Sequence, residues 1–218
     1  MNAPVHFGDL RRLTPISRSF GFDRGQPVDR YYIERFLAEE AAAIHGRVLE
    51  IGEDTYTRRF GGERVRRSDV LDLPQRDNAS ATLHADLTQA GHLPPAQFDC
   101  IIFTQTLQFI YDVDAAVATL HRLLRPGGVL LATFPGISQI CRFDMDRWGD
   151  YWRFTAAAAG RLLAGHFGPE QIDVVAHGNV LVAISFLHGL ATHELEPAEL
   201  AYCDPDYQFL ITARASKP

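Results

Sequence analysis

Residues 48–52, Val-Leu-Glu-Ile-Gly, have the pattern of a first β-strand that ends at a ligand-binding loop. An apolar run closes with Glu50 and Gly52, and a helix is expected after them. A dinucleotide-binding loop would continue as Gly-x-Gly-x-x-Gly, whereas this chain continues with Glu53 and Asp54. Two carboxylates oppose a phosphate group, because the backbone amides would have to bind it beside like charge. The loop therefore favours a ligand that has a positive centre and no phosphate.

The composition indicates one globular domain over residues 1–218. Hydrophobic residues make up 46% of the chain and charged residues 22%, which suits a sizeable core. The formal net charge of -6 argues against nucleic acid as a partner, because nucleic acid is bound by basic surfaces. The three cysteines are far apart and form no Cys-x-x-Cys pair, so we expect no metal site, no disulfide and a cytoplasmic location. The longest apolar stretch, residues 180–187, is too short to span a membrane.

Strands that alternate with helices follow an irregular segment at residues 1–28. The predicted strands cover residues 47–51, 64–68, 81–85, 98–103, 129–134, 171–176 and 207–213. The predicted helices begin at Asp29, which we expect to cap the first of them, and then cover residues 113–124, 155–167 and 180–190. This alternation indicates an α/β protein with a doubly wound, parallel sheet. Ligands of such sheets bind in the crevice at the carboxyl ends of the strands.

Four features of the chain resemble the class I S-adenosylmethionine (SAM)-dependent methyltransferases, in particular bacterial members of the type 11-like group. They are the segment at residues 48–52, Asp69 about 19 residues after Glu50, the pair Asp86 and Leu87, and the segments Phe-Asp-Cys-Ile-Ile-Phe at 98–103 and Leu-Leu-Arg-Pro-Gly-Gly-Val-Leu at 123–130. The resemblance covers residues 45–135. It implies a Rossmann-like sheet of seven mostly parallel strands, with helices on both faces and the last strand antiparallel. SAM has a sulfonium centre and no phosphate, in agreement with the acidic loop.

The resemblance also implies which residues contact SAM. Glu50 would bind the amino group, Asp69 the ribose hydroxyls, and Asp86 the adenine amine, with Leu87 beside the ring. Each carboxylate has a structural alternative as a cap or a turn residue, and Asp72 is an alternative partner for the ribose. The methionine part of SAM would contact residues that include Gly52, Thr104 and Gln105, and Tyr31 would either stack on the ligand or pack in the core.

Residues 136–200 are expected to form a lid and insertions on the substrate side. An aromatic and basic cluster in this region suits a sugar ring or an acidic acceptor, or else forms a packed lid. Its members are Trp148, Tyr151, Trp152 and Arg153. A hydroxyl acceptor needs a base, for which His188, Asp146 and Asp144 are the candidates. His188 has an unperturbed pKa near neutrality, although a structural role at a helix end is its alternative.

We therefore expect a SAM-dependent methyltransferase that methylates an oxygen of a sugar or a natural-product intermediate. The alternative is a methyltransferase fold that acts as a binding or partner subunit, because only Gly52 remains of the family's Gly-x-Gly-x-Gly loop. A nucleotide-dependent oxidoreductase is disfavoured by Glu53 and Asp54. The expected partner is a small molecule and neither nucleic acid nor a membrane, and a homodimer stays open.

Overall fold

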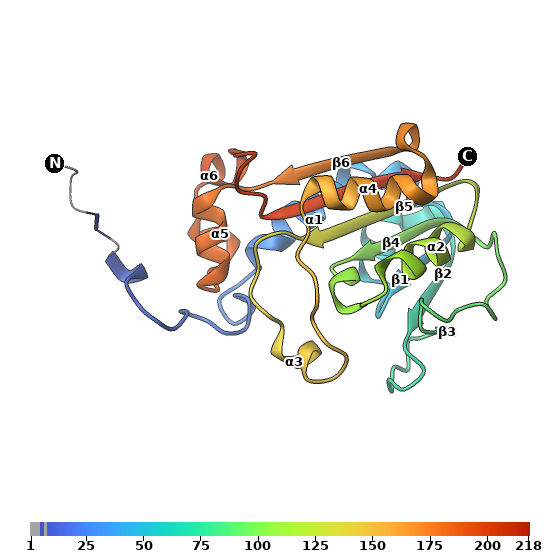
Figure 1. Cartoon of the computed structure of the whole chain (residues 1–218), viewed down its shortest axis with the longest axis horizontal. Helices are drawn as coiled ribbons and strands as arrows, with labels where there is room; N and C mark the ends of the chain where they lie inside the picture. Colours follow the sequence, from blue (N-terminus) through green and yellow to red (C-terminus); the bar gives the residue numbers. More distant parts are fainter. Residues whose placement is uncertain (1–4, 7) are drawn as a thin grey trace.

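One sheet of seven strands runs through the computed structural model of the chain, which describes residues 5–6 and 8–218 (Figure 1). Residues 1–4 and 7 of the expected irregular segment lie outside the described residues. The strand order is β3-β2-β1-β4-β5-β7-β6. The strands are β1 (Gly46–Ile51), β2 (Val65–Asp72), β3 (Leu83–His84), β4 (Phe98–Thr104), β5 (Leu124–Pro135), β6 (Ile172–His177) and β7 (Leu210–Ser216). β7 is antiparallel to both of its neighbours, and all other pairs are parallel, so the predicted fold class is confirmed.

Six α-helices accompany the sheet within the described part of the chain. They are α1 (Val28–Glu39), α2 (Val113–Leu123), α3 (Arg142–Met145), α4 (Ala156–Phe167), α5 (Val180–Leu187) and α6 (Pro197–Ala201). The side chains of Asp112, Thr155 and Asn179 cap α2, α4 and α5 by accepting backbone N–H bonds. The prediction that Asp29 caps the first helix is wrong, because α1 begins after Pro27 and has no side-chain cap. None of the helices in residues 5–6 and 8–218 is both long and apolar enough to cross a membrane.

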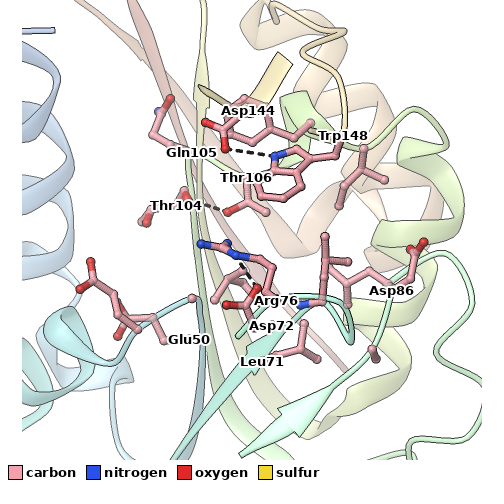
Figure 2. Close-up of a pocket in the computed structure, with 18 of the residues that line it drawn as sticks. Glu50, Leu71, Asp72, Arg76, Asp86, Thr104, Gln105, Thr106, Asp144 and Trp148 are labelled. Atoms are coloured by element: carbon pink, nitrogen blue, oxygen red, sulfur yellow. Dashed lines mark hydrogen bonds and ion pairs between the residues drawn. The ribbon is translucent and has the colours of Figure 1, made fainter. Parts of the chain in front are cut away.

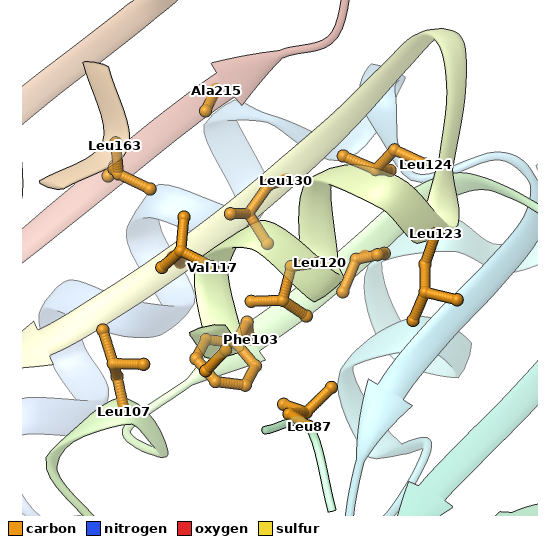
Figure 3. Close-up of a cluster of buried hydrophobic side chains, with 14 of the residues drawn as sticks. Leu87, Phe103, Leu107, Val117, Leu120, Leu123, Leu124, Leu130, Leu163 and Ala215 are labelled. Carbon is orange, nitrogen blue, oxygen red and sulfur yellow. The ribbon is translucent and has the colours of Figure 1, made fainter. Parts of the chain in front are cut away.

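The core lies on both faces of the sheet because successive strand residues point to opposite sides. On one face, Leu49 and Phe103 pack with side chains of α2 and α4, as Figure 3 shows for the α2 contacts. On the other face, Val48 and Ile102 pack with side chains of α1 and α5. A strand buried on both faces reads as a continuous apolar run, which is why β4 and β5 could be predicted from the sequence.

The second strand is longer than predicted. It pairs in parallel with β1 through Asp69 and Leu71 and ends at Asp72, four residues beyond the expected end. Its first half carries the exposed Arg66 and Arg67, which hid the strand in the sequence pattern. The extension moves Asp69 into the interior of the strand and places Asp72 at its carboxyl end.

The expected lid over residues 136–200 is shorter in the structure. Residues 156–177 include α4 and β6, which belong to the sheet and its covering layer. The preceding segment, residues 136–155, leaves β5, carries the short helix α3 and loops beyond the ends of the strands (Figure 1). This segment and the loops after β1, β2, β3 and β4 surround the candidate site.

Candidate functional site

A cleft of about 680 Å³ opens at the carboxyl ends of the parallel strands, where β1 and β4 lie side by side and the chain crosses from one half of the sheet to the other. Its volume falls within the range of pockets that hold cofactor-sized ligands. Eight residues predicted for the site line this cleft, several of them labelled in Figure 2: Glu50, Gly52, Asp86, Leu87, Thr104, Gln105, Trp148 and Tyr151. The fold therefore brings together most of the predicted cofactor residues.

Glu50 organises the turn that follows β1. Its buried carboxylate accepts hydrogen bonds from the Thr57 backbone N–H at 2.7 Å, the Thr57 hydroxyl at 2.8 Å and the Tyr56 backbone N–H at 3.2 Å. Burial raises the pKa of Glu50 to about 7, against the opposing effect of these hydrogen bonds. Glu50 thus caps the turn with its hydrogen bonds, which is the structural role given above as the alternative to a SAM contact, and it also lines the cleft.

Gly52 keeps the backbone of this turn accessible. Its φ of +79° is a conformation that disfavours residues with a side chain, and no atom lies within 4 Å of the place where a Cβ would stand. A ligand can therefore approach the backbone at Gly52. Tyr56 and Arg30 also line the cleft.

Asp72 is the acid at the carboxyl end of β2. It is 2% exposed and accepts hydrogen bonds from the Leu73 backbone N–H at 2.8 Å and from Asn78 Nδ2 at 2.6 Å. Arg76 Nη1 lies 3.3 Å from its Oδ1, as Figure 2 shows. Asn78 also donates to the Gly52 carbonyl at 2.7 Å, so it ties the loop after β2 to the loop after β1.

The structure corrects the position assigned to Asp69. Its carboxylate is 1% exposed and lies between Arg47 Nε at 2.7 Å and Arg67 Nη2 at 3.0 Å, and Asp69 is not among the residues that line the cleft. Although burial opposes ionisation, the hydrogen bonds from Arg47 and Arg67 hold the pKa of Asp69 below its ordinary value. Asp69 is a structural ion-pair partner, and Asp72 occupies the place expected for the ribose acid.

The loops after β3 and β4 complete the cleft floor. Asp86 accepts bonds from the backbone N–H and the hydroxyl of Thr88, both at 2.8 Å, which fixes the turn that also presents Leu87. Gln105 follows β4 with a φ of +46° and donates its backbone N–H to the Thr133 carbonyl at 3.1 Å. This bond to β5 holds the strained turn against the sheet.

Residues 136–155 form the far wall. Trp148 donates its indole N–H to Asp144 at 3.0 Å, and the guanidinium of Arg76 lies 5.2 Å from the centre of the indole ring (Figure 2). Arg76 and Asn78 were missed in the sequence, because a polar loop between two strands carries no pattern that marks it as part of a site.

A second cavity of about 240 Å³ adjoins the cleft and shares Arg30, Gln105 and Asp144 with it. Arg153 lines this cavity rather than the cleft, and its guanidinium is paired with Asp150. Trp152 lines neither of the two. Its indole N–H donates to the Ile110 carbonyl at 3.1 Å.

Three further predicted residues lie outside both cavities. Tyr31 makes an edge-to-face contact with Tyr32 at 5.0 Å, in agreement with its core-packing alternative. His188 follows the last residue of α5, where its carbonyl accepts from the backbone N–H groups of residues 16 and 17. Asp146 is exposed and pairs with Arg142 at 3.3 Å. Of the three candidate bases, only Asp144 lines the cleft. It lies in α3, whereas Asp146 follows the last residue of that helix.

Comparisons with known proteins agree with this geometry. A family model described as a methyltransferase domain matches residues 55–132. Malonyl-[acyl-carrier protein] O-methyltransferase of Serratia marcescens is 31% identical over 148 residues, which are 63% of this chain and 56% of that protein. The chain thus spans little more than half the length of this curated relative.

Solved structures share the fold at low sequence identity. N-methyltransferase NodS of Bradyrhizobium japonicum, in complex with S-adenosylhomocysteine (SAH), has a TM-score of 0.55 and 16% identity, with 94% of this chain and 95% of that chain covered. The [4+2]-cyclase SpnF has a TM-score of 0.55 and 18% identity, with 86% and 80% covered. Residues 55–132 are thus similar to a methyltransferase domain, and the chain shares its fold with solved methyltransferase structures.

Proposed function

We propose that this protein binds SAM in the cleft and transfers its methyl group to an oxygen of a small-molecule acceptor. One observation carries the proposal. Three carboxylates, Glu50, Asp72 and Asp86, lie at or just beyond the carboxyl ends of β1, β2 and β3 and line one cleft of cofactor size. Carboxylates suit the ammonium, ribose hydroxyls and adenine amine of SAM, all of which donate hydrogen bonds.

The chain fits this ligand although it lacks the other glycines of the family loop. The backbone at Gly52 is open to close approach, and no phosphate has to be bound beside Glu53 and Asp54. Asp72 already accepts two hydrogen bonds and pairs with Arg76, but a carboxylate has about four acceptor sites. It can therefore also accept from a ribose hydroxyl.

Asp144 is the proposed general base. When bound, SAM supplies an electrophilic methyl group and leaves as a neutral thioether. The hydroxyl of the acceptor must lose its proton in the same event, and Asp144 lies on the wall that the cleft shares with the second cavity. Its hydrogen bond from Trp148 orients the carboxylate and leaves acceptor capacity for the proton.

An oxygen acceptor is supported by the curated relative, whose name specifies O-methylation. The solved structures that share the fold are mixed in this respect, since they include an N-methyltransferase and a cyclase. Fold alone does not fix the chemistry. The acceptor atom therefore rests on the relative and on Asp144.

Calorimetric titration with SAM and SAH tests the proposal. We expect micromolar binding of both by the wild type. The variant Asp86→Ala removes the proposed partner of the adenine amine and should weaken SAH binding about tenfold, the value of one hydrogen bond to a charged group. A folded wild type that binds neither ligand would favour a binding or partner subunit instead, and unchanged SAH affinity in the variant would remove Asp86 from the site.

A further inference from the structure

The second cavity contains an unusual concentration of unpaired acceptor atoms. Among the residues that the structure describes, four buried side-chain oxygen or nitrogen atoms have no hydrogen-bond partner, and three of them belong to residues that line this cavity. They are Asp29 Oδ1, Gln108 Oε1 and Gln139 Oε1. A buried acceptor without a partner costs about 1–3 kcal/mol. A ligand that donates hydrogen bonds would remove this cost.

The orientation of these groups follows from their other contacts. Gln108 is 5% exposed, and its Nε2 donates to the Gln105 carbonyl at 2.8 Å, which leaves Oε1 as the free end of the amide. Arg30 approaches Asp29 at Oδ2, 3.4 Å away, and leaves Oδ1 unpaired. Burial raises the pKa of Asp29. The three free oxygens come from α1, from the segment after β4 and from the segment after β5.

The charges around the cavity are largely paired, which argues against a charged ligand. Asp29 faces Arg30, and Asp150 is paired with Arg153. The guanidinium of Arg153 also donates to the carbonyls of Ser138 and Gln139, so little of it is left for an anion. A cation would meet Arg30, and an anion would meet Asp29.

The remaining wall is aromatic and apolar. It consists of Phe20, Phe22, Phe109, Pro135 and Phe186. Ring faces of this kind pack against the C–H faces of a saturated ring. The volume of about 240 Å³ is below the usual range for drug-sized ligands, so it suits a molecule with a single ring.

From these observations we infer that the second cavity is the acceptor subsite and that it binds a neutral, polyhydroxylated single-ring molecule through Asp29, Gln108 and Gln139. The inference rests on the proposed function for its link to methyl transfer. Asp144 lies on the wall shared with the cleft, beside the place where a hydroxyl of this ligand would meet the methyl donor.

The test uses ligand-observed saturation-transfer NMR on the full chain, with and without saturating SAH. The probes are myo-inositol, D-glucose and L-rhamnose as polyols, tyramine and histamine as amines, and benzoate as an acid. We expect transfer to at least one polyol and to neither the amines nor benzoate. Binding of an amine or of benzoate in place of the polyols overturns the inference, and so does the absence of transfer to all three polyols.

Two variants connect the signal to the cavity. Gln139→Leu should weaken polyol binding about fivefold and Asp29→Asn about tenfold, since each removes one acceptor of a hydrogen bond. The SAH dissociation constant should change less than about twofold in both. Gln171→Leu makes the same replacement at an exposed position outside both cavities and should change neither affinity. Equal polyol affinity in all variants would overturn the assignment.

The outcomes separate this inference from the proposed function. Calorimetric SAH binding without polyol binding removes the acceptor subsite and leaves the cofactor site. Polyol binding that responds to Gln139→Leu, in a protein that does not bind SAH, keeps the subsite and removes the proposed methyl transfer. Gln139→Leu should also keep or raise the melting temperature, because it deletes a buried acceptor that has no partner in the free protein.

Discussion

The large cleft and the second cavity differ in how far the protein itself satisfies the hydrogen bonds of their polar side chains. In the cleft, Glu50, Asp72 and Asp86 each accept at least two hydrogen bonds from the protein itself. In the second cavity, Asp29, Gln108 and Gln139 each keep one buried oxygen without a partner. The first region is organised before any ligand arrives, whereas the second lacks partners that a ligand would have to provide.

The difference follows from how far apart in the sequence the polar side chains and their hydrogen-bond partners lie. The partners of the cleft carboxylates are close in the chain: Thr57 for Glu50, Asn78 for Asp72 and Thr88 for Asp86. Each carboxylate therefore stabilises the loop beside it, and the same local hydrogen bonds fix the position of the carboxylate. The walls of the second cavity come from four separate parts of the chain, within residues 20–30, 105–109 and 135–153 and at Phe186, and no local turn supplies a partner for the three free oxygens. Local loops therefore fix the carboxylates of the cleft, whereas the second cavity is formed by packing between separate segments.

The largest expected effect comes from replacing each of the two aspartates of β2 by alanine and comparing the two variants. Asp72→Ala should lower SAH affinity about 100-fold and the free energy of unfolding by about 3 kcal/mol, because it removes two hydrogen bonds to a buried carboxylate and the proposed ribose contact. Asp69→Ala should lower the free energy of unfolding by a similar amount, because Arg47 would lose its carboxylate partner and keep its hydrogen bond to Gln97. It should change SAH affinity less than about threefold. Chemical denaturation and calorimetry measure the two effects. The opposite ranking of SAH affinities would restore Asp69 as the cofactor acid.

A second test concerns the wall between the two regions. Asp144→Asn should lower kcat about 100-fold, the usual contribution of a general base, with SAH affinity unchanged within about twofold. Asp146→Asn is the matched control two residues away and should leave kcat unaltered, because Asp146 is exposed and pairs with Arg142. Once an acceptor is known, steady-state kinetics decides. Equal turnover in wild type and Asp144→Asn would show that Asp144 is not the general base and that its role is structural, through its hydrogen bond with Trp148.

The smallest expected effect concerns the proton on Glu50. The unfolded chain loses this proton near pH 4.5, whereas the folded protein keeps it to about pH 7. Between these values the folded state binds more protons, so its stability falls as the pH rises. Glu50→Gln should match the wild type at pH 4.5 and exceed its stability by about 1–3 kcal/mol at pH 8.

The same variant should weaken SAM binding about tenfold, because a neutral amide attracts an ammonium group less than a carboxylate does. Thermal unfolding over pH 4.5–8, with the wild type in parallel, measures the first effect, and calorimetry measures the second. A stability difference that does not change with pH would show that the proton on Glu50 is not coupled to folding.

The fold could be predicted because its strongest signals are local. Apolar runs marked β1, β4 and β5, and apolar residues at helical spacing marked α2. The carboxyl end of β2 was placed four residues too early, and both ends of β7 were placed three residues too early. In β2 the cause is its polar, exposed first half. Because the strand end was expected too early, the sequence favoured Asp69 over Asp72 as the partner of the ribose.

The cleft could be predicted only in part. Glu50, Gly52 and Asp86 sit beside strand ends, where the rule for parallel sheets applies. The base could not be chosen from the sequence, because Asp144 and Asp146 are two residues apart and the short helix α3, which ends between them, has no pattern that shows which of them lines the cleft. Asn78 and Arg76 act on Asp72 from an irregular loop, and the second cavity depends on packing between distant segments.

The placement of Trp148 has a spectroscopic consequence. The chain has two tryptophans, and both lie within residues 148–152. One lines the cleft beneath Arg76, with its indole N–H on Asp144, while the indole of Trp152 is tied to the Ile110 carbonyl. All tryptophan emission of the protein therefore originates beside the site, and no emission from elsewhere dilutes it. The intrinsic fluorescence of the unlabelled protein should therefore report directly on ligand binding at this wall of the cleft.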